Sequence, residues 1–304
     1  MDILLGLLVN VLEEGLIYGV MAMGVYITYK ILDFPDLSVD GSFPMGACVT
    51  AVLITAGVNP WLACIGSFVC GAIAGCVTGL LHVKLHISDL LSGILVMTGL
   101  YSINLLITGG QATMQFYNQN TIFTSGPAAL LPEAVKSYRV IIVALITVVI
   151  VKVLLDLYLK TKSGLLLRAA GSNAQYVVSL ARDPGKMKII GLAIGNGCAA
   201  LSGGLLSQQT ETANIASGTG MVVMALASVI IGTSLFRRVK FIKATCAVVL
   251  GAILYKACLV IAMQLGLPTN LLKLLMAVLF TVALVSNNLV SKRRKKQYVD
   301  PVQL

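Results

Sequence analysis

The sequence predicts an all-α polytopic membrane protein with about nine or ten transmembrane helices. Of its 304 residues, 58% are hydrophobic and only 11% are charged. The mean hydropathy is +0.93, far above the range of soluble globular domains. Apolar segments of about 20 residues, the length that crosses a bilayer as a helix, recur from one end of the chain to the other. We therefore expect a single transmembrane domain over residues 1–304.

The N-terminal region is expected to form two separate pieces. Residues 3–12 are apolar but too short to span a membrane alone, and Glu13 and Glu14 separate them from a full span, Leu16 to Leu32. We expect the first piece to be a short oblique helix that packs on the bundle. The chain begins without the basic residues and the small-residue cleavage site of a removable signal peptide, so none is expected.

The first span is followed by a polar interruption, DFPDLSVDGSFPMG, at residues 33–46. It holds three acidic residues, two prolines and two glycines. Carboxylates and irregular backbone are costly in hydrocarbon and are tolerated there only against protein or a water-filled cavity. Two interpretations follow: a surface turn, or a broken helix that lines a path. In the second, the candidate path residues are Asp36, Ser38, Asp40 and Ser42.

Three apolar stretches come next: Pro44 to Ala56, Trp61 to His82 and Leu90 to Thr108. His82 and His86 are four residues apart, a spacing that can bind a metal on a helix. No carboxylate completes such a site, so we expect a cytoplasmic turn there and neither a metal nor another cofactor.

Residues 110–137 form a polar loop that is nearly free of Lys and Arg, which places it outside the membrane under the positive-inside rule. The span Tyr138 to Leu159 leads from it to a loop at residues 160–188, where six basic residues accompany the single acid Asp183. The same rule places this second loop in the cytoplasm.

Within the cytoplasmic loop, Asn173 is expected to cap a short helix, Ala174 to Ala181, which Asp183-Pro184-Gly185 then stops. One side of this helix would show Tyr176, Val177 and Leu180, apolar residues at helical spacing that have no hydrocarbon to enter. This side requires a protein partner, unless the loop serves only to set the topology through its charges.

A second polar break follows the span Ile189 to Ser207. It contains Asn214, Ser217 and Thr219 and precedes a short apolar run, residues 221–236. The helices that follow the two breaks run in opposite directions, which predicts an inverted repeat with a path at the repeat interface. The repeats are residues 14–109 and 189–290, and the two sets of break residues would face each other.

The last spans are Lys240 to Leu265, in which Lys256 should face the interior or a polar partner, and Asn270 to Val290. A basic tail at residues 291–304 places the C-terminus in the cytoplasm.

Charge and motifs exclude other classes of function. The net charge is +10, but the basic residues cluster beside the spans, which indicates contact with anionic membrane lipid and no nucleic-acid binding. The seven cysteines lie in apolar runs and are expected in the core. The chain has no nucleotide-binding G-x-x-x-x-G-K-[ST] motif and no hydrolase motif, so we expect no enzyme activity of its own.

The segment SGLLLRAAGSNAQYVVSLARDPGKMK resembles the coupling region of ABC-importer permeases of the branched-chain amino acid and ribose type. The matching residues are Gly164, Arg168, Ala169, Gly171 and Asn173, and the family's usual Gly-Ile is replaced by residues 182–185. The resemblance implies that the short helix docks into a groove on a separate ATPase subunit. The ATPase-coupling residues would be Arg168, Gly171, Asn173, Tyr176, Val177 and Leu180.

The first polar break is similar to the D-L-S-V-G-S element of ribose-type permeases, with Asp40 inserted before Gly41. Its longer form looks like a permease group linked to tryptophan and tyrosine uptake in Gram-positive bacteria. In this superfamily the element borders the translocation pathway.

The resemblance therefore implies the membrane-spanning subunit of an ABC importer in a bacterial cell membrane. Its partners would be ATP-binding cassette ATPase subunits, an extracytoplasmic binding protein or lipoprotein, and a second copy of the permease. The solute would be small, with an aromatic amino acid favoured. The alternative is an ion-coupled secondary transporter or channel with Asp36 and Asp40 as ion sites, which leaves the Tyr176 helix without a partner.

Overall fold

The computed structural model describes residues 2–125, 138–236, 239, 242–266, 268 and 271–299, with side chains from residue 5 to residue 285 within these ranges. The elements, in chain order, are α1 (Asp2–Val25), the π-helix η1 (Tyr26–Ile31), α2 (Val39–Thr55), α3 (Pro60–Lys84), α4 (Asp89–Ile107), β1 (Thr113–Gln115), α5 (Arg139–Tyr158), α6 (Lys162–Ser172), α7 (Ala174–Ser179), α8 (Pro184–Thr210), β2 (Thr212–Asn214), the 3-10 helix η4 (Ile215–Gly218), α9 (Met221–Leu235), α10 (Ala244–Gln264) and α11 (Leu272–Val299).

The all-α membrane architecture is confirmed. Seven helical segments of the described chain are long and apolar enough to cross a membrane, and α2 and the first part of α11, Leu272–Val285, are shorter apolar helices. The basic run at residues 292–296 continues α11, which ends at Val299. Residues 300–304 of the expected tail lie outside the described chain.

The first helix corrects the expected two-piece N-terminus. α1 runs without a break through Glu13 and Glu14 and continues into η1. Both acids have partners: Glu13 Oε2 accepts a hydrogen bond of 3.0 Å from Gln209, and Glu14 forms an ion pair with Lys256. Because these partners satisfy the carboxylates, the acidic pair does not have to interrupt the helix. The ion pair also confirms the polar partner expected for Lys256.

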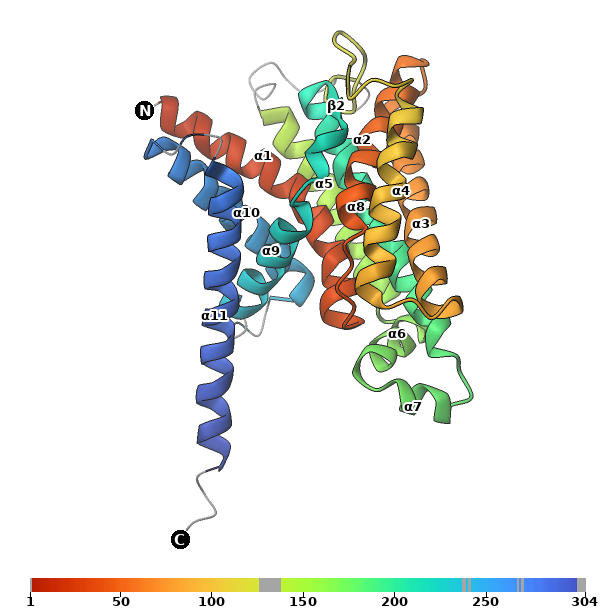
Figure 1. Ribbon diagram of the computed structural model, residues 1–304. Helices are drawn as coiled ribbons and strands as arrows, with labels where there is room; N and C mark the ends of the chain where they lie inside the picture. The colour runs from red at the N-terminus through yellow and green to blue at the C-terminus, as the bar shows by residue number, and fades with distance from the viewer. Residues whose placement is uncertain are drawn as a thin grey trace.

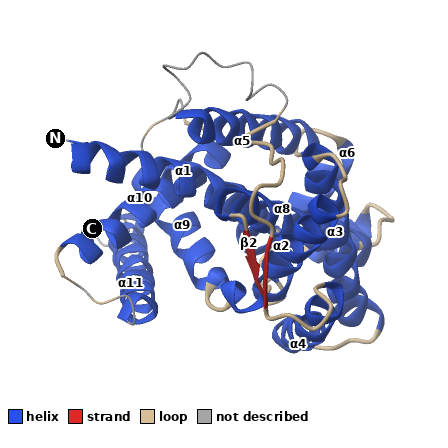
Figure 2. Ribbon diagram, turned by 90° about the horizontal axis from the view of Figure 1, so that it is seen from above, coloured by secondary structure: helices blue, strands red, loops and turns tan. Residues whose placement is uncertain are grey.

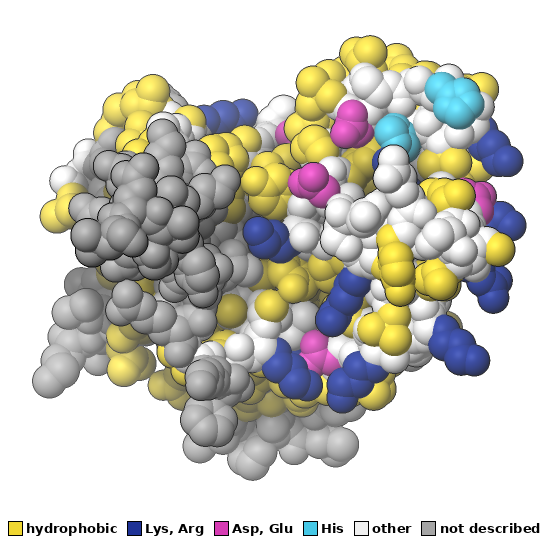
Figure 3. Space-filling view, turned by 90° about the horizontal axis from the view of Figure 1, so that it is seen from below, with side chains coloured by type: hydrophobic (Ala, Val, Ile, Leu, Met, Phe, Trp, Pro, Cys, Tyr) yellow, Lys and Arg dark blue, Asp and Glu magenta, His cyan; other side chains and the backbone are white. Residues whose placement is uncertain are grey.

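The two ends of the bundle differ in structure and charge. The end that carries the start of α1 and strands β1 and β2 is at the top of Figure 1 and is called the upper face; the end that carries α6, α7 and the end of α11 is the lower face. Seen from above, the strands cross the upper face beside α2, pairing Thr113 with Asn214 in antiparallel register (Figure 2). Lys and Arg side chains are distributed over the lower face (Figure 3).

The upper face also carries the described part of the expected outer loop, residues 110–125, whose remainder lies outside the described chain. α1 runs from the upper face downward, α8 returns upward, and α11 ends at the lower face.

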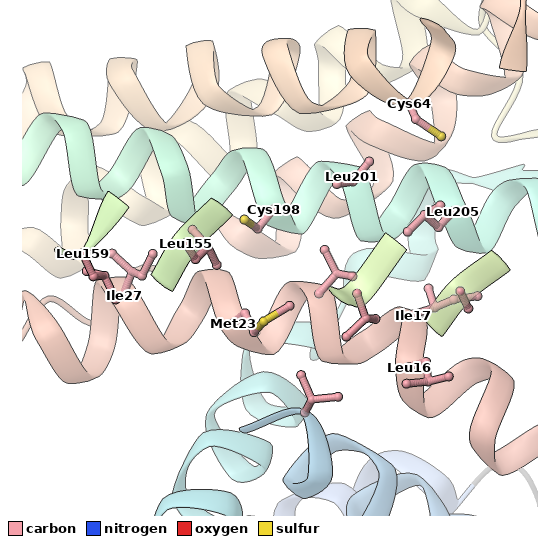
Figure 4. Packing of buried hydrophobic residues seen from close by; sticks show 14 of the residues in the cluster. Leu16, Ile17, Met23, Ile27, Cys64, Leu155, Leu159, Cys198, Leu201 and Leu205 are labelled. Atoms are coloured by element: carbon pink, nitrogen blue, oxygen red, sulfur yellow. The ribbon is translucent and has the colours of Figure 1, made fainter. Parts of the chain in front are cut away.

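The core lies where α1 and α8 cross, and α5 covers it (Figure 4). Ile17 and Met23 of α1 and Ile27 of η1 meet Cys198 and Leu205 of α8 there, all of them buried. The outer helices follow a recurring arrangement: α3 packs along α8, and α10 packs along α1. The inverted repeat, residues 14–109 and 189–290, stays a prediction that this recurrence supports.

Candidate functional site

The first polar break enters the interior of the bundle. From the end of η1, residues 33–38 run without helical structure to the start of α2. Asp36, Ser38 and Ser42 are buried. Asp36 Oδ1 accepts a hydrogen bond of 2.8 Å from the backbone N–H of Ser38 and one of 2.5 Å from the Ser38 hydroxyl. The break is therefore a discontinuous helix, and the surface-turn interpretation is wrong.

Asn196 organises this break, and the sequence analysis did not select it. Its Nδ2 donates to Asp36 Oδ2 at 2.7 Å, while its Oδ1 accepts from Ser42 Oγ at 2.6 Å and lies 3.1 Å from Ser38 Oγ. It is fully buried near the middle of α8. An amide within an apolar span was the available signal, because such groups are costly unless they have partners.

The second break brings the start of α9 against the start of α2. β2, η4 and Gly220, at φ +89°, separate α8 from α9. Asp40 of α2 accepts hydrogen bonds from the backbone N–H groups of Gly220 at 2.9 Å and of Val222 at 2.7 Å. The carboxylate thus caps the N-terminus of α9, where the helix dipole favours negative charge. The starts of two helices, α2 and α9, thus meet at one carboxylate.

A glycine makes this approach possible. A Cβ at Gly218 would overlap the carbonyl oxygen of Asp40 and the ring of Pro44. Pro44 has no N–H to donate to that carbonyl, so the start of α2 departs from regular helical hydrogen bonding where η4 meets it. Nearby, Asn104 of α4 donates to the carbonyl of Gly41 at 3.2 Å, a second contact that the sequence analysis missed.

The polar side chains of the second break bond mainly within their own turn. Asn214 Oδ1 accepts from the N–H of Ala216, while Ser217 Oγ donates to Asn214 O and Thr219 Oγ1 donates to Ala216 O. Thr219 Oγ1 also lies 3.3 Å from Nζ of Lys273 on α11. The second break meets Asp40 through its backbone at residues 218–222, and the expectation that the two sets of polar side chains face each other across a path stays a prediction.

The basic loop at residues 160–188 folds into two helices, α6 and α7, that project from the lower face (Figure 1). The predicted cap is confirmed: Asn173 Oδ1 accepts from the N–H of Tyr176 at 3.2 Å. α7 ends at Ser179, two residues earlier than expected. Asp183 does not stop it but caps α8, accepting from the N–H of Gly185 at 2.8 Å with Pro184 in the first turn. α8 therefore begins at Pro184, five residues before the expected Ile189.

The exposed face of α7 differs by one residue from the prediction. Tyr176 and Leu180 are 56% and 48% exposed, as expected for a docking face. Val177 is buried, because this side of α7 packs toward α8, and Val178, at 60% exposed, replaces it on the open face. On α6, Arg168 is exposed, and Gly171 lies directly on the carbonyl of Ile31 at the end of η1.

Comparison with known proteins identifies the chain. The family model described as "Branched-chain amino acid transport system / permease component" matches residues 7–284. The chain belongs to this family of permeases. It is thus a permease component of an ABC-type transport system.

Curated relatives include several transport permeases. The tyrosine transport system permease protein of Clostridioides difficile is 43% identical over 93% of this chain and 92% of its own length. The probable branched-chain amino acid transport permease protein LivH of Methanocaldococcus jannaschii is 27% identical over 73% of each chain. The autoinducer 2 import system permease protein LsrC of Salmonella paratyphi B is 27% identical over 65% of this chain and 54% of its own length. No solved structure matches the permease.

The two histidines of the permease do not converge on a shared ligand. His82 Nδ1 lies 2.9 Å from the carbonyl of Ile87, and its Nε2 lies 3.0 Å from Nζ of Lys188. His86 sits in the following turn with a φ of +55°. Among the described residues, no group of three or more His, Cys, Asp or Glu side chains could hold a metal ion.

Proposed function

We propose that this permease is the membrane-spanning subunit of a bacterial importer for an amino acid, with aromatic amino acids preferred. Separate ATP-binding cassette subunits bind at the lower face, and a binding protein or lipoprotein delivers the solute at the upper face. Two permease copies form the pathway between them. The relative named for tyrosine transport, 43% identical over 93% of the chain, supports the substrate class.

The observation that carries the proposal is the exposed apolar face of α7. Tyr176, Val178 and Leu180 lie outside the bundle, at the basic end that we assign to the cytoplasm under the positive-inside rule. These side chains point neither into the core nor toward any span. An apolar face of this kind is stabilised by a protein groove, as the coupling role requires.

The contacts of this loop suggest how movement of α7 would reach the interior. α6 rests on the end of η1 through Gly171, and Val177 and the Asp183 cap connect α7 to α8. Asn196 of α8 in turn holds Asp36 and Ser42 at the first break. Closure of the ATPases would therefore shift α8 and the polar break together, which would give alternating access.

The break residues are proposed to border the pathway rather than to bind ions. Asp36 accepts only from hydroxyl, amide and backbone donors, and Asp40 accepts from two backbone N–H groups. A cation site needs oxygen ligands that converge on one point with lone pairs free, whereas these lone pairs are used by internal donors. This arrangement gives no support to the ion-coupled alternative.

Replacing Tyr176 or Leu180 with Asp is expected to leave the permease in the membrane but separate it from its ATPase. The new charge would have to be buried unpaired in an apolar groove, which costs several kcal/mol. Copurification of the ATPase with tagged permease measures the effect. The control is Tyr117→Asp, which places the same charge on a 54% exposed tyrosine of the upper loop and should retain the ATPase. Wild-type copurification with both α7 variants would contradict the docking role.

We expect cells that produce the complete importer to take up labelled tyrosine. This uptake should disappear when the permease alone is omitted. Unlabelled tryptophan and phenylalanine should compete, while ribose at the same concentration should not. Competition by ribose alone would reject the amino acid assignment and keep the importer role. A tyrosine uptake rate that does not depend on the permease would reject tyrosine as its solute, and labelled ribose measured in the same cells would then test the importer role.

A further inference from the structure

A groove with one apolar arm and one basic arm opens near the lower face. Two cavities of about 690 and 640 Å³ share Tyr26, Tyr29, Lys30 and Ala244 in their walls, so they adjoin each other along η1 and together make the groove. Three of these residues come from η1, whose π-helical turn places them along the same wall. Such π-turns occur frequently at functional sites.

The apolar arm lies between α9 and α11. Its walls include Val229 and Ile230 of α9 and Leu279, Val282 and Ala283 of α11. α11 stands at the side of the bundle in both the side view and the view from above (Figures 1 and 2). Val282 is 57% exposed, so this arm is open to the surroundings of the bundle beside α11.

The basic arm lies between η1 and α6. Lys30 and Arg168 line it, and among the described residues of its wall Asp33 is the one acid. Neither cation has an ion-pair or hydrogen-bond partner among the described residues. The nearby Asp156 cannot serve both, because it is held by Lys152, Lys243 and Thr245. Two unpaired cations at the mouth of a groove favour an anionic ligand.

We infer that this groove binds an anionic phospholipid, with the headgroup phosphate between Lys30 and Arg168 and an acyl chain between α9 and α11. Each arm of the groove matches one part of this ligand. Basic pockets between membrane helices bind anionic headgroups, and the apolar arm can accommodate the hydrocarbon chain. A free amino acid fits less well, because its ammonium group would enter a space with two cations and a single acid. A lipid bound there would connect α6 to η1, α9 and α11.

The experiment compares phosphatidylglycerol with phosphatidylcholine of the same acyl chains, added at equal mole fraction to the purified permease in neutral detergent. We expect phosphatidylglycerol to raise the unfolding midpoint by a few degrees more than phosphatidylcholine does. Native mass spectrometry should show one tightly retained phosphatidylglycerol per chain. The variant Lys30→Gln/Arg168→Gln should show the same unfolding midpoint with both lipids and should no longer retain phosphatidylglycerol.

Two further variants separate this site from general attraction to a basic surface. Lys162→Gln/Lys186→Gln removes two exposed cations of the same face that do not line the groove, and it should keep the phosphatidylglycerol preference. Val282→Phe should narrow the apolar arm and lower lipid retention with both cations still present.

Several results would overturn the inference. The first is an equal shift of the unfolding midpoint with the two lipids in the wild type. The second is a phosphatidylglycerol preference that survives in Lys30→Gln/Arg168→Gln. The third is loss of that preference to the same extent in the Lys162→Gln/Lys186→Gln control. Stabilisation by inorganic phosphate to the same extent would show a simple anion site. Stabilisation by tyrosine alone, lost in Lys30→Gln/Arg168→Gln, would assign the groove to the solute pathway.

Discussion

Gly46→Val is expected to abolish accumulation of folded permease. α2 and α8 cross so closely that a Cβ at Gly46 would overlap the carbonyl group and Cα of Ala200. The reverse contact is equally tight, since a Cβ at Gly203 of α8 would overlap the carbonyl of Phe43. Overpacking a core costs about 1–3 kcal/mol where side chains can shift, and more here because backbone meets backbone.

The yield of folded protein is measured by fluorescence-detected size-exclusion chromatography of a tagged permease. The unfolding midpoint is then measured for any monodisperse material. The matched control is Gly99→Val in α4, where an added Cβ would meet nothing within 4 Å and which should yield near-normal amounts of folded protein. Equal yield and midpoint for Gly46→Val and Gly99→Val would show that the α2–α8 crossing is looser than the structure indicates.

Asp40→Ala is expected to lower solute uptake about tenfold or more while the ATPase remains bound. The change leaves the N–H groups of Gly220 and Val222 without their acceptor, at a cost of about 1–3 kcal/mol for each unsatisfied group. It also removes a negative charge from the N-terminus of α9. A shift of about 1.4 kcal/mol against a conformation needed for transport lowers its population tenfold. Asp40→Asn, which keeps one acceptor, should be intermediate.

Labelled uptake and copurification of the ATPase, measured on the same cells, check this expectation. Asp89→Ala is the control, because Asp89 also lies in the first turn of a helix, α4, but makes no described side-chain contact with a second helix. Uptake at the wild-type rate in Asp40→Ala would show that the link between the two half-helices is not needed for transport. Loss of the ATPase in the same variant would instead indicate general misfolding.

Much of this architecture follows from local patterns in the sequence. Each predicted span after the first corresponds to a helix. The length of an apolar run, together with the Gly, Pro and Asp residues at its ends, determines locally where a helix begins and ends. The two polar breaks are present for the same reason, and so is the Asn173 cap, which needs only an N–H three residues away. The uneven distribution of Lys and Arg distinguishes the loop at residues 160–188 from the loop at 110–137.

Tertiary structure decided the contacts between residues distant in the chain. Glu13 and Glu14 stay within one helix because Gln209 and Lys256 reach them from α8 and α10. Asp40 of α2 caps α9, Asn196 joins α8 to the first break, and Val177 turns inward because α8 lies beside α7. A buried polar or apolar group must find a partner, but its own sequence neighbourhood does not specify which of several helices supplies it. That choice depends on how the helices cross.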